Sequence, residues 1–155
     1  GIDVSLSALK DTMINFWTEA EGKLHVDAWR VVKQVEGFKI NIAQRERADK
    51  TREHRLFFVN LGGYRGQDFE EYHYKQLVVA KDVVEATKKA KSSQFFLNHI
   101  SPHVDDKYGL DVDDIFAIED ALPAAIRERY QIVITEDDHQ PADEVNIGYL
   151  KFSDL

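Results

Sequence analysis

The chain has 155 residues, of which 43% are hydrophobic and 31% charged, enough for a globular domain with its own core. It contains no cysteine, which excludes disulfides, thiolate metal sites and cysteine nucleophiles. The formal net charge of −8 argues against nucleic-acid binding, and no apolar run is long enough to cross a bilayer. We therefore expect a cytoplasmic protein that binds neither nucleic acid nor membrane.

The first segment is predicted to be a helix that is capped at its start by Asp3 or Ser5 and ends at Gly22. Its apolar residues recur at helical spacing and form one stripe, as in a helix that covers a core. The stripe consists of Leu6, Leu9, Met13, Phe16 and Trp17. We expect these side chains to be buried.

A β-hairpin is predicted next. Apolar and polar residues alternate from Leu24 onward, which indicates a half-buried strand, and the apolar run continues through Val35. Glu36-Gly37 is a tight-turn dipeptide, and alternation resumes over residues 38–42. The charged stretch Gln44–His54 shows no periodicity and is interpreted as a linker.

Residues 55–80 are expected to form the centre of the fold. Leu56–Leu61 is an unbroken apolar run, typical of a strand buried on both faces. Gly62-Gly63 is expected to end it with a turn of positive φ, and Tyr72–Ala80 is predicted to be a second strand. Polar and ionisable side chains gather between the two strands: Tyr64, Arg65, Glu70, Glu71 and His73.

The rest of the chain continues this mixture of helices and strands. Asp82 is predicted to begin a helix that runs to about Leu97, with Glu85 completing a capping box. Further on, the patterns predict two strands, a short helical turn between them and one last strand. Their ranges are Val112–Ile118, Ala124–Arg129, Tyr130–Thr135 and 145–149.

The two halves of the chain can be aligned with each other. Residues 2–4 and 16–17 match 81–83 and 95–96, residues 25–29 match 111–115, and residues 38–42 match 130–134. We interpret this as an α+β fold made of two pseudo-repeats of a strand–strand–helix–strand–strand (ββαββ) unit. The second copy is complete, and the first lacks its opening pair of strands. We expect a mixed or antiparallel sheet with two helices packed on one face. The predicted segments are 1–43, 44–54, 55–136 and 137–155, within one compact domain.

Several short motifs resemble a bacterial domain-of-unknown-function family, the DUF1543-like proteins. They are Leu61-Gly62-Gly63, Glu71-Tyr72-His73 before a strand, and His25-Val26-Asp27 before Gly37-Phe38. The resemblance implies tandem copies of one unit and implies no activity. Asp111-Val112-Asp113 stands where the second unit would carry its His-x-Asp motif, which puts a complete site there in doubt.

The candidate catalytic residues are Glu71 and His73, because residues two apart on a strand share a face and a carboxylate beside an imidazole is a workable general-base pair. His25 and Asp27 repeat this spacing and are candidate binding residues, together with Tyr64 and Arg65. The alternative is that each pair is a structural polar contact. If both pairs faced one cleft they would suit Zn, Mn or Fe, but nothing in the sequence brings them together, so no metal or cofactor is assigned. The acidic residues around Asp113 are interpreted as a solvated loop.

Two functions remain open. The first is a non-enzymatic protein that oligomerises, most simply as a homodimer, and binds a small ligand or a partner. The second is a metal- or histidine-assisted enzyme that uses Glu71 and His73. The homodimer is expected because the incomplete first repeat leaves sheet edges uncovered. The sequence identifies neither the ligand nor the substrate.

Overall fold

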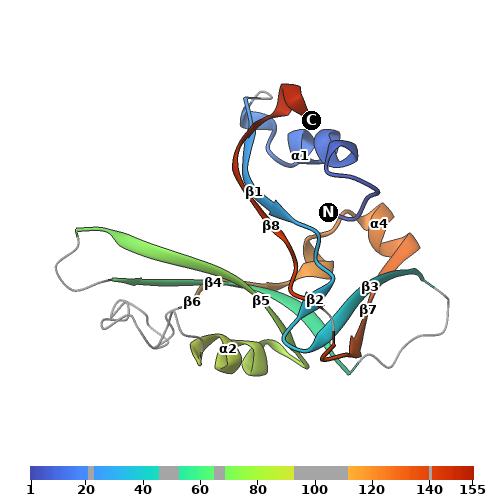
Figure 1. Ribbon diagram of the computed structural model, residues 1–155, viewed down its shortest axis with the longest axis vertical. Coiled ribbons are helices and arrows are strands. Elements are labelled where there is room, and N and C mark those ends of the chain that lie inside the picture. Colours follow the sequence, from blue (N-terminus) through green and yellow to red (C-terminus); the bar gives the residue numbers. More distant parts are fainter. Residues whose placement is uncertain (21–22, 46–52, 65–68, 93–111, 140) are drawn as a thin grey trace. The chain divides into compact units, whose positions relative to one another are not determined.

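The computed structural model describes residues 1–20, 23–45, 53–64, 69–92, 112–139 and 141–155 (Figure 1). Over these residues it confirms the α+β class, with eight strands in antiparallel sheets and few helices. The chain forms two compact units, residues 1–33 with 141–155 (unit 1) and residues 34–140 (unit 2). These limits differ from the predicted segments because strand pairing joins the start of the chain to its end.

Unit 1 is built on a two-stranded antiparallel sheet. Strand β1 (His25–Arg30) pairs with β8 (Val145–Lys151), and the pairing has a β-bulge between Val26 and Ala28. The predicted partner of β1 was the strand after Glu36-Gly37, so the long hairpin is a correction: β1 finds its partner at the far end of the sequence. Phe152, in the 3₁₀ turn Phe152–Asp154 after β8, is buried.

The helical part of unit 1 is shorter than predicted. A 3₁₀ turn over Ser7–Leu9 leads into α1 (Lys10–Phe16), and a second 3₁₀ turn covers Thr18–Ala20. The predicted burial of its aromatic residues is wrong, because Phe16 is 86% exposed and Trp17 is 58% exposed. The helix ends at Phe16, so it is too short to carry its apolar stripe as one continuous face, and the neighbouring sheet has only two strands.

Unit 2 begins with the tight hairpin that the sequence predicts at Glu36-Gly37. Strand β2 (Gln34–Val35) pairs with β3 (Phe38–Gln44) across this dipeptide. Both turn residues have positive φ, 51° at Glu36 and 82° at Gly37, as a two-residue hairpin turn of type I′ requires. Strand β7 (Tyr130–Glu136) pairs along the other edge of β3 and completes a three-stranded sheet.

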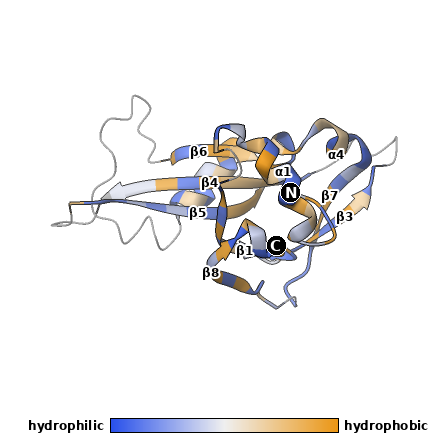
Figure 2. Ribbon diagram, turned by 90° about the horizontal axis from the view of Figure 1, so that it is seen from above, coloured by the Kyte–Doolittle hydropathy of each residue, from blue (hydrophilic) through white to orange (hydrophobic). Residues whose placement is uncertain are grey.

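The second sheet of unit 2 is centred on β4 (Arg55–Tyr64), which lies between β5 (Glu71–Ala80) and β6 (Val112–Ala117). Helix α2 (Val83–Lys91) covers one face of this sheet (Figure 1). That face holds a buried hydrophobic cluster, to which the sheet and α2 contribute Phe57, Val59, Leu61, Val78, Ala80, Ala86, Ala90 and Ala117. Figure 2 shows β5 change from hydrophilic residues at its start to hydrophobic residues at its end.

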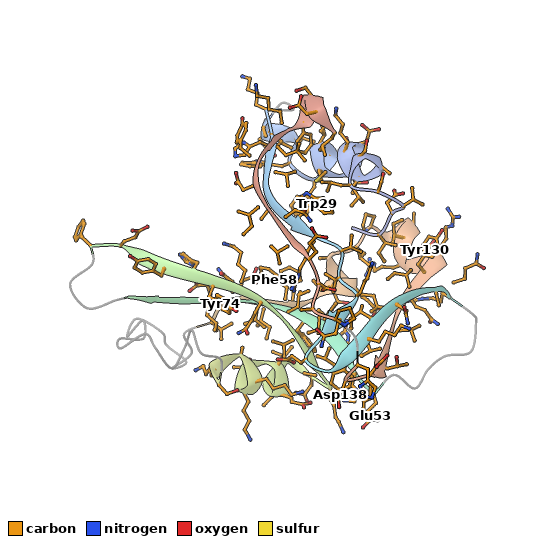
Figure 3. All side chains as sticks on the ribbon, viewed as in Figure 1. Trp29, Glu53, Phe58, Tyr74, Tyr130 and Asp138 are labelled. Atoms are coloured by element: carbon orange, nitrogen blue, oxygen red, sulfur yellow. The ribbon has the colours of Figure 1, made fainter. Side chains whose placement is uncertain are left out.

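The register of these strands assigns side chains to the two faces. Phe58 pairs with Leu77 and Leu61 pairs with Tyr74, so Phe58 and Tyr74, both labelled in Figure 3, lie on opposite faces. The face without α2 therefore carries Phe58, Asn60 and Gly62 from β4 together with Glu71, His73 and Lys75 from β5. This second face holds the candidate site.

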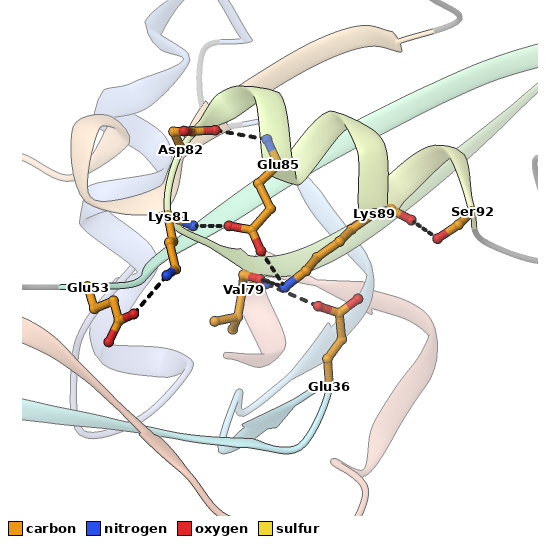
Figure 4. A network of polar contacts seen from close by, with 8 residues as sticks. All are labelled: Glu36, Glu53, Val79, Lys81, Asp82, Glu85, Lys89 and Ser92. Atoms are coloured by element: carbon orange, nitrogen blue, oxygen red, sulfur yellow. Dashed lines mark hydrogen bonds and ion pairs between the residues drawn. The ribbon is translucent and has the colours of Figure 1, made fainter.

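The start of α2 is fixed by the predicted capping residues. The Asp82 side chain accepts a hydrogen bond from the Glu85 N–H at 2.8 Å, and Glu85 Oε2 accepts one from the Lys81 N–H at 2.8 Å. Lys89 Nζ lies 3.3 Å from Glu85 Oε1 and donates to the Val79 carbonyl at 2.7 Å (Figure 4). The network ties the first turns of α2 to the end of β5.

Glu85 and Lys81 are held in their charged forms by this network. The Lys81 N–H and the Lys89 ammonium lower the pKa of Glu85. The Glu53 carboxylate, 2.8 Å from Lys81 Nζ, raises the pKa of Lys81, and Lys81 in turn lowers the pKa of Glu53. All three groups are at the surface.

The remaining predictions from local pattern are confirmed where residues are described. The predicted helical turn is α4 (Ala124–Arg129), and β6, β7 and β8 lie where strands were predicted. The predicted extension of α2 to Leu97 falls outside the described residues. Within them, no helix has the length and apolar character needed to span a bilayer.

Candidate functional site

Three ionisable side chains meet on the face of the β5-β4-β6 sheet that α2 leaves uncovered. His73 lies opposite Gly62, and Glu71 lies opposite Tyr64, so both β5 residues point to the same face. On the other side of β4, Asn60 pairs with Asp114 and Leu61 with Val112. Asp113 is therefore the extra residue of a β-bulge in β6, and bulges re-aim side chains in this way.

The bulge brings the Asp113 carboxylate to His73. Asp113 Oδ2 lies 2.7 Å from His73 Nδ1, and Glu71 Oε1 lies 3.4 Å from His73 Nε2. The imidazole thus has a carboxylate at each of its two nitrogens. One ligand atom from each of the three residues can be chosen so that all lie within 4.8 Å of one another.

Gly62 makes room for this contact. A Cβ atom at position 62 would lie 2.7 Å from Asp113 Oδ2 and 2.8 Å from Oδ1, closer than real Cβ atoms approach oxygen. Gly62 has no positive φ and lies within β4, so the predicted turn at Gly62-Gly63 is wrong. The absence of a side chain at Gly62 leaves space in which the carboxylate lies between two strands.

The cluster is partly shielded from water. The side chains of Glu71, His73 and Asp113 are 35%, 40% and 30% exposed. Asn60 Nδ2 donates to Asp113 Oδ2 at 3.4 Å, while its own Oδ1 is buried and has no hydrogen-bond partner among the described residues.

The arrangement has two chemical capacities. An imidazole whose Nδ1–H is held by a carboxylate presents Nε2 as a base or as a metal ligand. A carboxylate oxygen 3.4 Å from that nitrogen can share a bound divalent ion with it. Histidine and carboxylate together suit zinc, manganese or iron, and the absence of thiolates disfavours softer ions.

The other predicted site residues are not part of this cluster. His25 Nε2 lies 3.2 Å from Asp27 Oδ1, and the His25 ring lies 4.6 Å from that of Tyr149, all within unit 1. The predicted contribution of Arg65 falls outside the described residues, as does the side chain of Tyr64. The predicted pair Glu71–His73 is brought together, and the pair His25–Asp27 forms a separate contact.

Asp113 is the member of the cluster that sequence reasoning missed. The sequence interpretation places it in a solvated acidic loop, and Asp-x-Asp in place of His-x-Asp puts a complete site there in doubt. The alignment of the two halves could have indicated Asp113 as a site residue, because it places Asp113 at the position of Asp27. Both residues also lie where the strand register shifts, but the extra residue is in β8 opposite Asp27, whereas Asp113 is itself the extra residue of β6.

Residues 4–42 match the family model described as Domain of Unknown Function (DUF1543). The match confirms the resemblance over this range, which includes His25 and Asp27 and leaves the Glu71–His73–Asp113 cluster outside. No curated protein and no solved structure is significantly similar to the chain. The family description assigns no activity, so a function has to be argued from the cluster itself.

Proposed function

We propose that the chain binds a divalent transition-metal ion at the Glu71–His73–Asp113 cluster. The observation that carries the proposal is the convergence of one imidazole and two carboxylates from β5 and β6 within 4.8 Å. The cluster lies on a sheet face rather than in a loop, so rigid strands position its ligands.

A metal ion held by so few protein ligands keeps positions for water or for a small ligand. Such an ion polarises what it binds and promotes the ionisation of a bound water. The chain's own residues hold and orient the ion, and the partial exposure of all three side chains allows a small molecule to approach. The proposal therefore combines small-ligand binding with the metal-assisted alternative predicted from the sequence.

The test is a titration of the metal-free protein with Zn²⁺ against a chromophoric chelator. We expect one ion per chain, and an affinity lowered about tenfold or more in His73→Ala and in Glu71→Gln. His25→Ala is the matched control, because His25 also lies beside a carboxylate on a strand but outside the cluster. Binding that is absent, or that survives in His73→Ala, would refute the proposal.

Self-association is a second candidate function, favoured by the surface of unit 1. This unit exposes a set of large apolar side chains on α1, on the β1–β8 sheet and near them: Val4, Phe16, Trp17, Trp29, Val31, Val145, Ile147 and Tyr149. Exposed apolar surface of this extent is typical of an interaction site, and a two-stranded sheet gains stability when further strands or faces cover it. A homodimer supplies such cover with one symmetric contact.

Light scattering over a dilution series tests the homodimer. We expect twice the chain mass at high concentration, and a shift toward the monomer in Ile147→Lys, which places a charge on the exposed β8. A compact monomer at every concentration would refute it. The cytoplasmic location and the bacterial origin stay predictions from the sequence.

A further inference from the structure

Asp113 and Glu71 approach different nitrogens of His73. Asp113 Oδ2 faces Nδ1 and Glu71 Oε1 faces Nε2. One imidazole gives a single nitrogen to a single metal ion, because its two lone pairs point in different directions. An ion bound to one nitrogen of His73 therefore lies beside the carboxylate that faces this nitrogen. The other carboxylate contacts the nitrogen that does not bind the ion.

The two separations decide which carboxylate has which role. Ligand atoms about 2.0–2.1 Å from a tetrahedral zinc ion lie about 3.3 Å from each other. The 3.4 Å between His73 Nε2 and Glu71 Oε1 fits this spacing. The 2.7 Å between His73 Nδ1 and Asp113 Oδ2 is shorter and is the length of a charge-assisted N–H···O hydrogen bond.

We infer that Asp113 is a positioning residue, which accepts the Nδ1–H of His73 and thereby directs the Nε2 lone pair toward Glu71 and the ion. The role of the ion rests on the proposed function, whereas the hydrogen bond between Asp113 and His73 does not. Carboxylates that hold the second nitrogen of a metal-binding histidine fix its tautomer and ring orientation in this manner. Gly62 is required for the contact between Asp113 and His73, because a side chain at this position would displace the Asp113 carboxylate.

The inference predicts the tautomer of His73 in the metal-free protein. Long-range ¹H–¹⁵N correlation spectra at about pH 9, where an ordinary imidazole is neutral, show which ring nitrogen carries the proton. We expect Nδ1–H at His73, assigned by the loss of its signals in His73→Ala. His25 is the internal reference with the opposite expectation, since its Nε2 faces Asp27.

Asp113→Leu removes the acceptor while keeping much of the side-chain volume, and Asp114→Leu on the neighbouring exposed residue is the matched control. We expect His73 to lose its Nδ1–H preference in Asp113→Leu and to keep it in Asp114→Leu. Gly62→Ala is a second route to the same loss, which keeps the test usable if Asp113→Leu unfolds. A wild-type Nε2–H tautomer, or an Nδ1–H tautomer unchanged in both Asp113→Leu and Gly62→Ala, would overturn the inference.

The addition of Zn²⁺ tests this inference and the proposed function separately. Adding Zn²⁺ should perturb the Nε2 signal of His73, and Asp113→Leu should lower the Zn²⁺ affinity about 10- to 100-fold. Perturbation at Nδ1 instead would make Asp113 a direct ligand and refute its positioning role. If Zn²⁺ does not bind while the tautomer still depends on Asp113, the proposed function fails and the positioning of His73 by Asp113 stands.

Discussion

His73 Nδ1 lies 2.7 Å from Asp113 Oδ2, across the backbone of Gly62 on the strand between them. The contact joins β5 to β6, two strands that do not pair with each other. It exists because the central strand has no side chain at this position and because the bulge in β6 turns Asp113 toward it. The candidate site therefore depends on a glycine that contributes no side chain to it.

Gly62→Ala is expected to weaken Zn²⁺ binding about tenfold with little effect on the fold. The atoms that a Cβ would meet are the terminal oxygens of Asp113, which can rotate away, so the free energy of unfolding should change by less than about 0.5 kcal/mol. Parallel zinc titration and urea denaturation measure the two quantities. An unaltered zinc affinity would show that the position of Asp113 does not matter for binding.

The exposures of two phenylalanines predict opposite outcomes for the same substitution. Phe57 on β4 is 1% exposed within the buried cluster, so Phe57→Ala should lower the free energy of unfolding by about 3–5 kcal/mol. Phe16 at the end of α1 is 86% exposed, so Phe16→Ala should cost less than about 0.5 kcal/mol. Urea denaturation of dilute protein compares the two variants. A large loss of unfolding free energy in Phe16→Ala would show that α1 packs in the core, as its apolar stripe predicted.

Local sequence patterns predicted most of the elements. The capping pair Asp82 and Glu85, the hairpin turn Glu36-Gly37 and the helix Ala124–Arg129 are formed by residues close together in the chain, so a short window contains the information. The face shared by Glu71 and His73 follows from strand alternation in the same way.

Strand partners could not be predicted, because pairing is a contact between distant parts of the chain. The β1–β8 sheet joins residues 25–30 to 145–151, and no local pattern specifies that partner. The place of Asp113 depends on a bulge, and one extra residue in a strand changes the direction of its side chain without a clear sequence signal. Phe16 and Trp17 look like core residues in a helical pattern until the helix is seen to end at Phe16.

The internal repeat stays a prediction, although the pairing of β3 with β7 bears on it. These strands contain the aligned segments 38–42 and 130–134, in which Ile40 corresponds to Ile132 and Ile42 to Ile134. In the sheet Ile40 lies opposite Ile134 and Ile42 opposite Ile132, so the aligned segments pair about a local two-fold centre. This is the arrangement expected where two copies of one unit meet edge to edge.

Gly37→Ala is expected to destabilise unit 2 by about 1–2 kcal/mol, because an alanine at a φ of 82° is strained. Its Cβ would also lie 2.5 Å from Asp138 Oδ1. Gly62→Ala is the matched control, since it makes the same chemical change without a positive φ. Equal urea midpoints for Gly37→Ala and the wild type would mean that the turn adopts another conformation.

Glu85 makes the stability of the fold depend on pH. Its pKa in the folded chain lies below the ordinary value of 4.5, chiefly because its carboxylate accepts the Lys81 N–H and pairs with Lys89. A group whose pKa is lowered by folding stabilises the folded state above the unfolded pKa, and that contribution is lost as the pH falls through the folded pKa. Glu85→Gln should therefore unfold at lower urea than the wild type at about pH 7, and the difference should shrink as the pH falls below the ordinary pKa of 4.5.

Glu128→Gln, on the exposed surface of α4, is the control for removing one negative charge. A difference between Glu85→Gln and the wild type that stays constant over this range would show that the charge of Glu85 does not contribute to the cap of α2.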